Sequence, residues 1–322
     1  MLELYRAVNS IFIGVDIGGT KCAVVKSDDY GKIINKVKFP TTDVHATMNN
    51  ILLAIQKCGE AEAIGISCGG PLDSEKGIIM SPPNLIGWDN IHIVKVLEDK
   101  FKIPAFLQND ANACALAEWK LGAGLGTKNM IFLTFGTGLG AGIILNGKLY
   151  AGTNGNAGEV GHIRLENFGP VGYGKSGSFE GFCSGSGIAQ MGKIYAMSQF
   201  QMGKNTSFCK EADMIDEVTA KSIAEYAAEG YEDAKYIYEQ CGEQLGKGLS
   251  VLIDILNPEI IVIGSIFARC ENLLREKMEK VLKKECLSYN LDVCRIVPAM
   301  LGEEIGDYAG IAVAINGISN IK

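Results

Sequence analysis

The stretch IFIGVDIGGTKCAVVKS, residues 11–27, decides the fold, because it reads as two buried strands joined by a glycine turn. The same layout returns about 120 residues later in MIFLTFGTGLGAGIILNGKLYAG, residues 130–152. The turn is DIGGT in the first copy and FGTG in the second. A repeated unit of this kind predicts two related domains that face each other, with the paired glycine turns at the cleft between them.

Helices and strands alternate after each copy of the repeat, which predicts an α/β fold. The consecutive hairpin strands that open each half predict mixed sheets rather than purely parallel ones. The expected strands are residues 32–40, 63–68, 103–110, 260–264 and 294–299, and the expected helices are 45–57, 91–101, 111–121, 186–200, 219–229, 231–256, 269–288 and 306–316.

Composition excludes several classes of function. The chain has 322 residues, is 47% hydrophobic and carries a net charge of −7, so it offers no basic surface for nucleic acid or an anionic membrane. Its longest apolar stretch is interrupted by Asp254, Pro258 and Glu259, so we expect no membrane span. Ten scattered cysteines, without a C-x-x-C pair or a secretory signal, predict free thiols and a cytoplasmic location.

The two glycine turns suit phosphate binding. Their glycines let backbone N–H groups approach phosphate oxygens, and Thr20 adds a hydroxyl donor. Asp16, at the end of the first strand, is placed to hold a hydrated Mg²⁺ beside those phosphates. A single turn of this type is more often a tight hairpin, but two in matching positions favour a phosphate site.

Polar residues gather where the strand at 103–110 ends and a helix begins. Asn109 and Asp110 are good helix N-caps, which explains them without any function. The carboxyl end of a strand is also where α/β proteins bind ligands, so Asp110 is a candidate general base. The loop SPPNLIGWDN, residues 81–90, reads from the sequence alone as a surface turn.

The segment GPVGYGKS, residues 169–176, spells the P-loop pattern. No buried strand precedes it, and the glycines that follow leave no room for a helix at Lys175. Glu159, His162 and Glu180 surround this segment without the spacing of a metal site. Carboxylates accept hydrogen bonds from hydroxyl groups and imidazole can donate or accept, so these residues suit a hydroxyl-rich ligand better than a phosphate or a metal.

Seven motifs together resemble the ROK family of sugar kinases, within the actin-like/hexokinase/Hsp70 ATPase superfamily of ribonuclease H-like fold. They run in the family's order along nearly the whole chain: GVDIGGTK, GPLD, PPNLIGW, QNDANACALAE, TFGTGLGAGII, NGNAGEVGH and SFEGFCSG. The resemblance implies a discontinuous small domain (residues 1–112 plus about 303–322) and a large domain (113–302), and an ATP-dependent hexose kinase that works as a homodimer.

The resemblance also assigns roles to individual residues. Asp110 is the general base that takes the proton from the sugar hydroxyl attacking the γ-phosphate. The residues implied to hold the sugar are Asn84, Asn109, Glu159, His162 and Glu180. Those implied to bind ATP are Asp16, Gly18, Gly19, Thr20, Lys21, Gly136, Thr137, Gly138 and Gly264, with Mg²⁺ near Asp16.

The chain departs from the family pattern in two places. Val171, Tyr173 and Ser178 occupy positions where most members carry zinc-binding cysteines, so we expect no structural zinc, and a loop held by packing of Val171, Tyr173 and Phe179. The adenosine motif reads Gly264-Ser265 where a second glycine is usual.

Two alternatives remain beside the kinase. A sugar-responsive repressor would carry a DNA-binding domain ahead of the sugar domain, whereas about ten residues precede the first strand here. A sugar-binding regulatory protein without catalysis is the other alternative, and the presence of Asp110 disfavours it.

Overall fold

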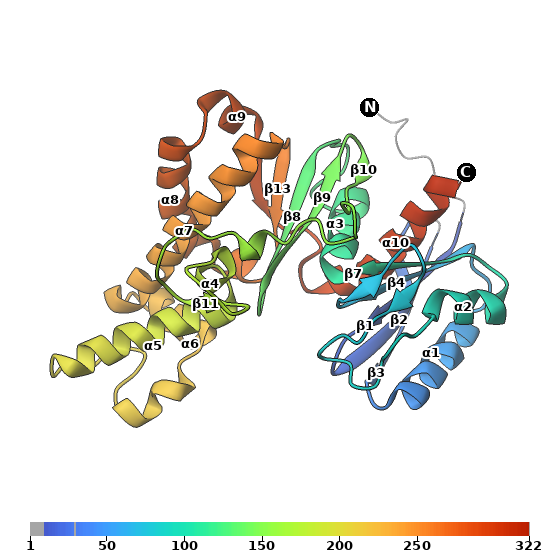
Figure 1. Cartoon of the computed structure of the whole chain (residues 1–322), viewed down its shortest axis with the longest axis horizontal. Coiled ribbons are helices and arrows are strands. Elements are labelled where there is room, and N and C mark those ends of the chain that lie inside the picture. The colour runs from blue at the N-terminus through green and yellow to red at the C-terminus, as the bar shows by residue number, and fades with distance from the viewer. Residues whose placement is uncertain (1–9, 29, 322) are drawn as a thin grey trace.

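The computed structural model describes residues 10–28 and 30–321, and two five-stranded sheets form its framework (Figure 1). The first sheet has the order β3-β2-β1-β4-β7 and the second the order β10-β9-β8-β13-β14. The strands of the first sheet are β1 (Phe12–Ile17), β2 (Lys21–Ser27), β3 (Ile33–Pro40), β4 (Ala63–Cys68) and β7 (Ala105–Asn109). Those of the second are β8 (Met130–Phe135), β9 (Leu139–Leu145), β10 (Lys148–Leu149), β13 (Ile260–Ile263) and β14 (Arg295–Pro298).

The two sheets have the same topology, which confirms the predicted repeat. In each sheet the first three strands form an antiparallel meander, β1-β2-β3 or β8-β9-β10. Two parallel strands then extend the sheet on the other side, β4-β7 or β13-β14. The mixed α/β architecture expected from the repeat is therefore present in both halves.

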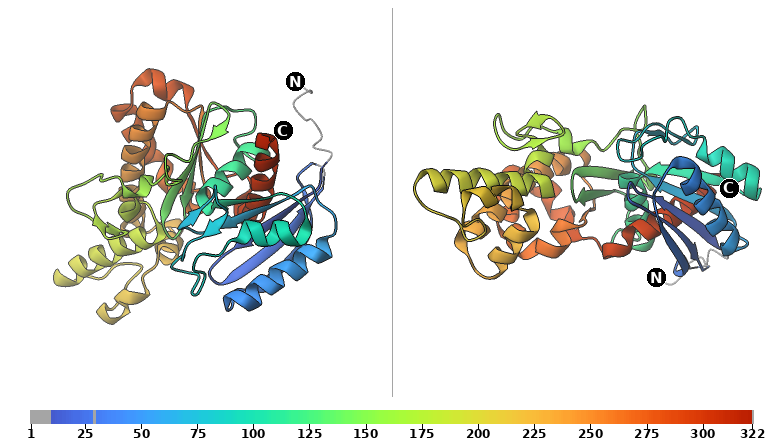
Figure 2. Two further views of the ribbon diagram at one scale, coloured as in Figure 1. Left: turned by 45° about the vertical axis from the view of Figure 1, so that its right-hand side comes forward. Right: turned by 90° about the horizontal axis from the view of Figure 1, so that it is seen from below.

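Helices cover the outer sides of both sheets (Figures 1 and 2). The first sheet carries α1 (Val44–Cys58) and α2 (Ile93–Phe101). The second half adds α4 (Phe179–Phe182), α5 (Gly185–Gln201), α6 (Ala220–Ala228), α7 (Glu232–Leu256), α8 (Ile266–Glu285) and α9 (Ser288–Val293). Short elements are the hairpins β5 (Leu72–Asp73) with β6 (Ile78–Ile79) and β11 (Val171–Gly172) with β12 (Lys175–Ser176), and the 3₁₀ turns η1 (Val160–His162), η2 (Ala212–Glu217) and η3 (Gly302–Glu304).

Two helices lie between the sheets, α3 (Asp110–Leu121) and α10 (Ile305–Ile321). Helix α10 packs on β1, β4 and α3, and α3 packs in turn on β8 and β9. Helix α10 approaches the first sheet at backbone distance, because a side chain on Gly65 would overlap the carbonyl of Gly310. The chain thus returns to its first sheet at its end, while the exact bounds of the two domains stay a prediction.

The loop at residues 81–90 differs from the surface turn that its sequence predicts. Leu85 and Trp88 are buried within the apolar core of the first sheet, although Asn84, the residue just before Leu85, is exposed. The loop is therefore anchored by two side chains. The loop's proline, glycine and asparagine content did not reveal that anchoring, because burial of Leu85 and Trp88 depends on how they pack in the core of the first sheet.

The helix predicted at residues 269–288 has different bounds in the structure. It begins earlier, at Ile266, bends at Cys270 and ends at Glu285, and a separate short helix α9 follows.

All ten cysteines are free thiols, as expected. In the described part of the chain, no helix has the length and apolar character needed to cross a membrane.

Candidate active site

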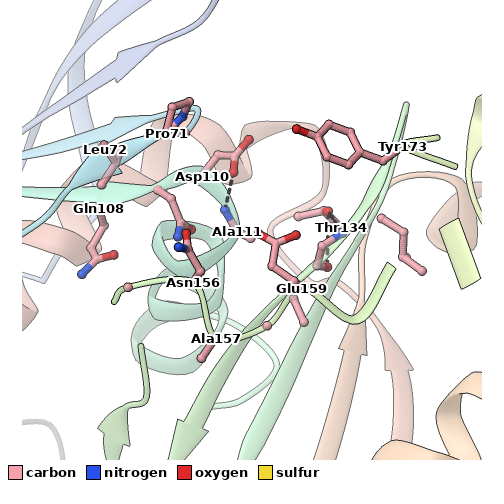
Figure 3. Close-up of a pocket in the computed structure, with 18 of the residues that line it drawn as sticks. Pro71, Leu72, Gln108, Asp110, Ala111, Thr134, Asn156, Ala157, Glu159 and Tyr173 are labelled. Atoms are coloured by element: carbon pink, nitrogen blue, oxygen red, sulfur yellow. Dashed lines mark hydrogen bonds between the residues drawn. The ribbon is translucent and has the colours of Figure 1, made fainter. Parts of the chain in front are cut away.

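A pocket of about 610 Å³ opens between the two sheets, and we call it the inner pocket (Figure 3). The first half of the chain contributes residues 70–72, Ser74 and Asn84, and the second half contributes Thr134, residues 136–141 and 155–159, Tyr173 and Glu180. The start of α3, residues 108–111, lies between them. Segments that are distant in sequence therefore meet here. Six residues were predicted to bind the sugar or to act as general base, and five of them line this pocket: Asn84, Asn109, Asp110, Glu159 and Glu180.

Asp110 is the first residue of α3 and faces the inner pocket. Asn109 caps the helix, since its side-chain oxygen accepts the Asn112 N–H at 2.8 Å. The structural reading of this pair as a cap is thus correct for Asn109, and it leaves Asp110 free to point into the pocket. One carboxylate oxygen of Asp110 accepts the Ala111 N–H at 2.8 Å, which fixes the direction of the group.

The pKa of Asp110 lies above its ordinary value. Water reaches the carboxylate through the pocket, but the protein surrounds it closely, and this loss of hydration raises the pKa. The hydrogen bond from Ala111 acts in the opposite direction and is the weaker effect. A carboxylate with a raised pKa in a cavity is a stronger proton acceptor than one in water.

Glu180 also lines the inner pocket and lies on the short helix α4. Ser178 caps this short helix by accepting the Gly181 N–H at 3.1 Å, and a Glu180 carboxylate oxygen accepts the Leu139 N–H at 2.9 Å. Glu159 stands just ahead of η1, and Figure 3 shows its carboxylate directed into the pocket below Asp110 and Tyr173. The pocket thus carries several hydrogen-bond acceptors around one enclosed space.

A second pocket of about 830 Å³, the outer pocket, adjoins the first at the glycine turn of the second sheet. Gly136 and Thr137 line both pockets, so the two pockets meet at this turn. The outer pocket extends over apolar surface between α6 and the start of α8. Its polar lining residues include Ser186, Thr219, Lys221, Glu225, Ser265, Arg269 and Asn272.

The sequence motifs pointed to Gly136 and Thr137 in the outer-pocket lining and to the neighbourhood of Ser265, but to none of the other polar residues named above. Gly264 itself does not line the outer pocket; it directly follows β13, and its N–H donates to the Leu133 carbonyl. Ser265, the next residue, does line it. Arg269 and Asn272 follow Ser265 on α8 at positions one helical turn apart, a signal that could have been read once the glycine turn before the helix was recognised.

Ser265 has φ +55° and ψ −111°, a backbone conformation that favours glycine. We expect Ser265→Gly to raise the free energy of unfolding by about 1 kcal/mol, because it removes this strain at a modest entropic cost. Urea unfolding of both proteins at equal m-value measures the change. Ser319→Gly, in the exposed end of α10, is the control and should lower stability. A Ser265→Gly protein less stable than the parent would contradict the expectation.

The glycine turn of the first sheet lies behind the Asn84 loop rather than on a pocket wall. The Gly18 N–H donates within the turn to the Lys21 carbonyl at 3.1 Å, and Gly19 packs directly against Asn84. None of Gly18, Gly19, Thr20 and Lys21 lines the inner or the outer pocket.

Asp16, at the end of β1, is half-buried near two other carboxylates. Its pKa is raised to about 6, first by burial and then by the negative charges of Asp307 and Asp110, which outweigh the opposite effect of the nearby Lys21 and Lys38. Carboxylates that disfavour each other's ionisation fit a site that a divalent cation would neutralise. In the described residues, no three His, Cys, Asp or Glu side chains form a complete metal site.

The segment GPVGYGKS forms the β11-β12 hairpin, so the prediction that it is no P-loop is confirmed. The packing expected for it is wrong in part. Phe179 is fully buried, but Val171 is 46% exposed and Tyr173 is 92% exposed. Hydrogen bonds hold the loop instead, because Gln190 pairs with both backbone groups of Val171.

His162 stands beside the inner pocket but does not line it. Its ring is exposed and meets the edge of the Tyr173 ring at a centroid distance of 6.4 Å. Its backbone carbonyl accepts a hydrogen bond from the Lys175 ammonium at 2.7 Å. Tyr173 therefore stands at the pocket wall where the sequence led us to expect His162.

Residues 12–315 match the ROK family. A glucokinase of Halalkalibacterium halodurans is 31% identical over 313 residues, which cover 93% of either chain. The N-acetylglucosamine repressor of Escherichia coli is 29% identical, over 88% of this chain and 71% of the repressor.

Among solved structures, a ROK family glucokinase from Streptomyces griseus in complex with glucose and AMPPNP superposes with a TM-score of 0.74 at 28% identity. The match covers 95% of this chain and all of that one. The fold is that of the actin-like ATPases, with two related α/β domains and mixed sheets around a cleft. The match over residues 12–315 and these relatives show that the chain belongs to the ROK family.

Proposed function

We propose that this protein is an ATP-dependent sugar kinase, which transfers the γ-phosphate of ATP to a hydroxyl of a hexose. The observation that carries the proposal is the junction of the two pockets at Gly136 and Thr137, with the Asp110 carboxylate in the inner one. A sugar in the inner pocket and a nucleotide in the outer pocket would meet at this turn. Kinase relatives such as the glucokinase of Halalkalibacterium halodurans support the assignment.

In this proposal, Asp110 accepts the proton of the attacking sugar hydroxyl. Its raised pKa and its position at the start of α3 support that role. Asn84, Asn109, Glu159 and Glu180 hold the other hydroxyls, since amides and carboxylates match a polyol in hydrogen-bonding capacity. His162 acts through Tyr173 or after closure of the cleft, because it lies outside the pocket lining.

The nucleotide lies in the outer pocket, whose apolar floor between α6 and α8 suits a purine base. Gly136, Thr137 and Gly138 then face its phosphates. Closure of the cleft would bring the turn at Gly18, Gly19, Thr20 and Lys21 toward the same phosphates. Mg²⁺, held near Asp16, supplies charge neutralisation of the phosphates when it is bound.

The functional assay measures ADP release with a coupled system across glucose, fructose, mannose, allose, N-acetylhexosamines and β-glucosides. The proposal expects turnover of at least one hexose that depends on both ATP and Mg²⁺. Binding of a sugar without any ADP release would instead favour the regulatory alternative, which the similarity to the N-acetylglucosamine repressor of Escherichia coli supports.

We also propose that the enzyme acts as a homodimer in the cytoplasm. The ten free cysteines support a reducing compartment. Light scattering of the purified protein measures the oligomeric state.

The pH dependence of kcat/KM should report on Asp110. The base works only when ionised, so kcat/KM falls as the pH drops through its raised pKa, with a limiting slope of one. The decline should therefore begin at a higher pH than the ordinary pKa of an aspartate, about 3.9, would give. Initial rates at saturating ATP, followed from about pH 8 to the lowest pH at which the protein stays folded, measure it. An acid limb no higher than that of an ordinary aspartate would argue against this assignment.

A further inference from the structure

Tyr173 is the most exposed aromatic residue on the wall of the inner pocket, with 92% of its surface open to solvent. Figure 3 shows its phenol end pointing across the pocket toward Asp110, with Glu159 below both. Its ring and that of His162 form an edge-to-face pair, and the high exposure of Tyr173 shows that this contact leaves most of its ring open. An open aromatic face beside carboxylates is a surface that a ligand can cover.

The turn that carries Tyr173 does not favour a tyrosine. Tyr173 and Gly174 form the two-residue loop between β11 and β12, with φ +44° and +75°. This left-handed pair is typical of a type I′ hairpin turn, in which asparagine, aspartate or glycine is preferred at the first position. A bulky residue there costs stability, so the local structure does not explain the choice of residue.

The hairpin is nevertheless held firmly. The Gln190 side chain accepts the Val171 N–H at 3.0 Å and donates to the Val171 carbonyl at 2.9 Å. The Ser176 hydroxyl donates to the Gly169 carbonyl, and Arg164 donates to the Ser176 carbonyl at 2.7 Å. The ring of Tyr173 is therefore presented to the pocket by a fixed hairpin rather than by a free loop.

We propose that Tyr173 is a sugar-contacting residue that makes the enzyme prefer gluco-configured pyranoses; this inference rests on the proposed kinase function. A pyranose with equatorial hydroxyls directs its hydroxyls outward to acceptors such as Glu159 and Glu180. Its two faces then carry only axial hydrogens and form apolar surfaces that an aromatic ring covers well. An axial hydroxyl, as at C2 of mannose or C3 of allose, interrupts one of these faces.

Two substitutions of Tyr173 test the proposal. Tyr173→Phe keeps the ring, and we expect its KM for glucose to stay within about threefold of the parent, since only one exposed hydroxyl is lost. Tyr173→Asn removes the ring and suits the left-handed turn. We expect its KM for glucose to rise about tenfold, as loss of buried aromatic area implies, with the effect in KM rather than in kcat or the KM for ATP. Its preference for glucose over mannose or allose should decline.

Control variants distinguish a loss of sugar contact from a loss of folded structure. Tyr289→Asn removes an equally open tyrosine, 86% exposed on α9, that does not line the inner pocket, and it should leave all constants unchanged. Thermal unfolding should show Tyr173→Asn to be at least as stable as the parent. An unchanged KM for glucose in Tyr173→Asn would overturn the proposal, as would an equal loss of affinity in Tyr173→Phe.

The role of Tyr173 can also be tested if the protein proves not to be a kinase. If the parent protein phosphorylates none of the sugars, calorimetric titration with glucose still decides the role of Tyr173, because an unchanged Kd in Tyr173→Asn overturns it and a weakened one supports it. A parent that neither phosphorylates nor binds glucose, mannose or allose would overturn both proposals.

Discussion

Asp110→Asn should lower kcat by about 10²-fold or more, the low end of what removal of a general base costs. Asparagine keeps the shape of the side chain and its oxygen can still accept the Ala111 N–H, so α3 should begin as before. It has no proton-accepting carboxylate, however, and the attacking hydroxyl would have to lose its proton to water. The KM for sugar should change much less than kcat.

Asp43→Asn is the matched control for this variant. Asp43 also stands at a helix N-terminus, where it caps α1 by accepting the Ala46 N–H at 3.0 Å, but it lies outside both pockets. Asparagine caps as well as aspartate, so this variant should keep full activity. Steady-state rates of ADP release measure both. Wild-type kcat in Asp110→Asn would remove Asp110 from the proposed mechanism.

Gly65→Ala should destabilise the protein by about 3 kcal/mol or more, the largest stability effect that we expect from a single methyl group. A Cβ atom at this position in β4 would lie 2.0 Å from the Gly310 carbonyl oxygen and 2.4 Å from the Ala314 nitrogen. Both neighbours are backbone atoms of α10, so no side-chain rotation can relieve the overlap. The helix would have to move away from the sheet and open the core between them.

Gly69→Ala provides the comparison, because a Cβ atom there meets nothing within 4 Å. Urea unfolding followed by circular dichroism measures both variants, and the yield of folded protein reports on Gly65→Ala if it fails to fold. Equal stability of the two variants would show that α10 is not held at backbone contact with β4.

The sequence predicted much of the fold because the decisive signals are local. A buried strand followed by a glycine turn and a second strand can be read within about twenty residues, and its repetition predicted the shared topology of both sheets. The same reasoning found Asp110, since a strand end and a helix start adjoin in the chain. It also rejected the P-loop spelling, because the flanking residues form neither a buried strand nor a helix.

The site was only partly readable because its walls come from distant segments. Tyr173 gave no signal of its own beyond replacing an expected cysteine, and His162, which the motif favoured, lies outside the pocket lining. Most of the outer pocket was missed for the same reason, although Gly136 and Thr137, which the sequence assigned to ATP, line it. Arg269 and Asn272 sit on α8, and they line a cavity only because α6 packs opposite them.

By itself, then, the sequence determined the duplicated α/β architecture, the position of the candidate base and the glycine turns, all of which follow from periodicity and from residue choice at strand ends. The tertiary structure decided which side chains share a pocket, that Trp88 anchors the Asn84 loop, and that Tyr173 rather than His162 stands at the pocket wall. The physical reason is that periodicity states which face of an element is buried, whereas the partner of that face depends on long-range packing, in which each element takes the place that its neighbours leave open.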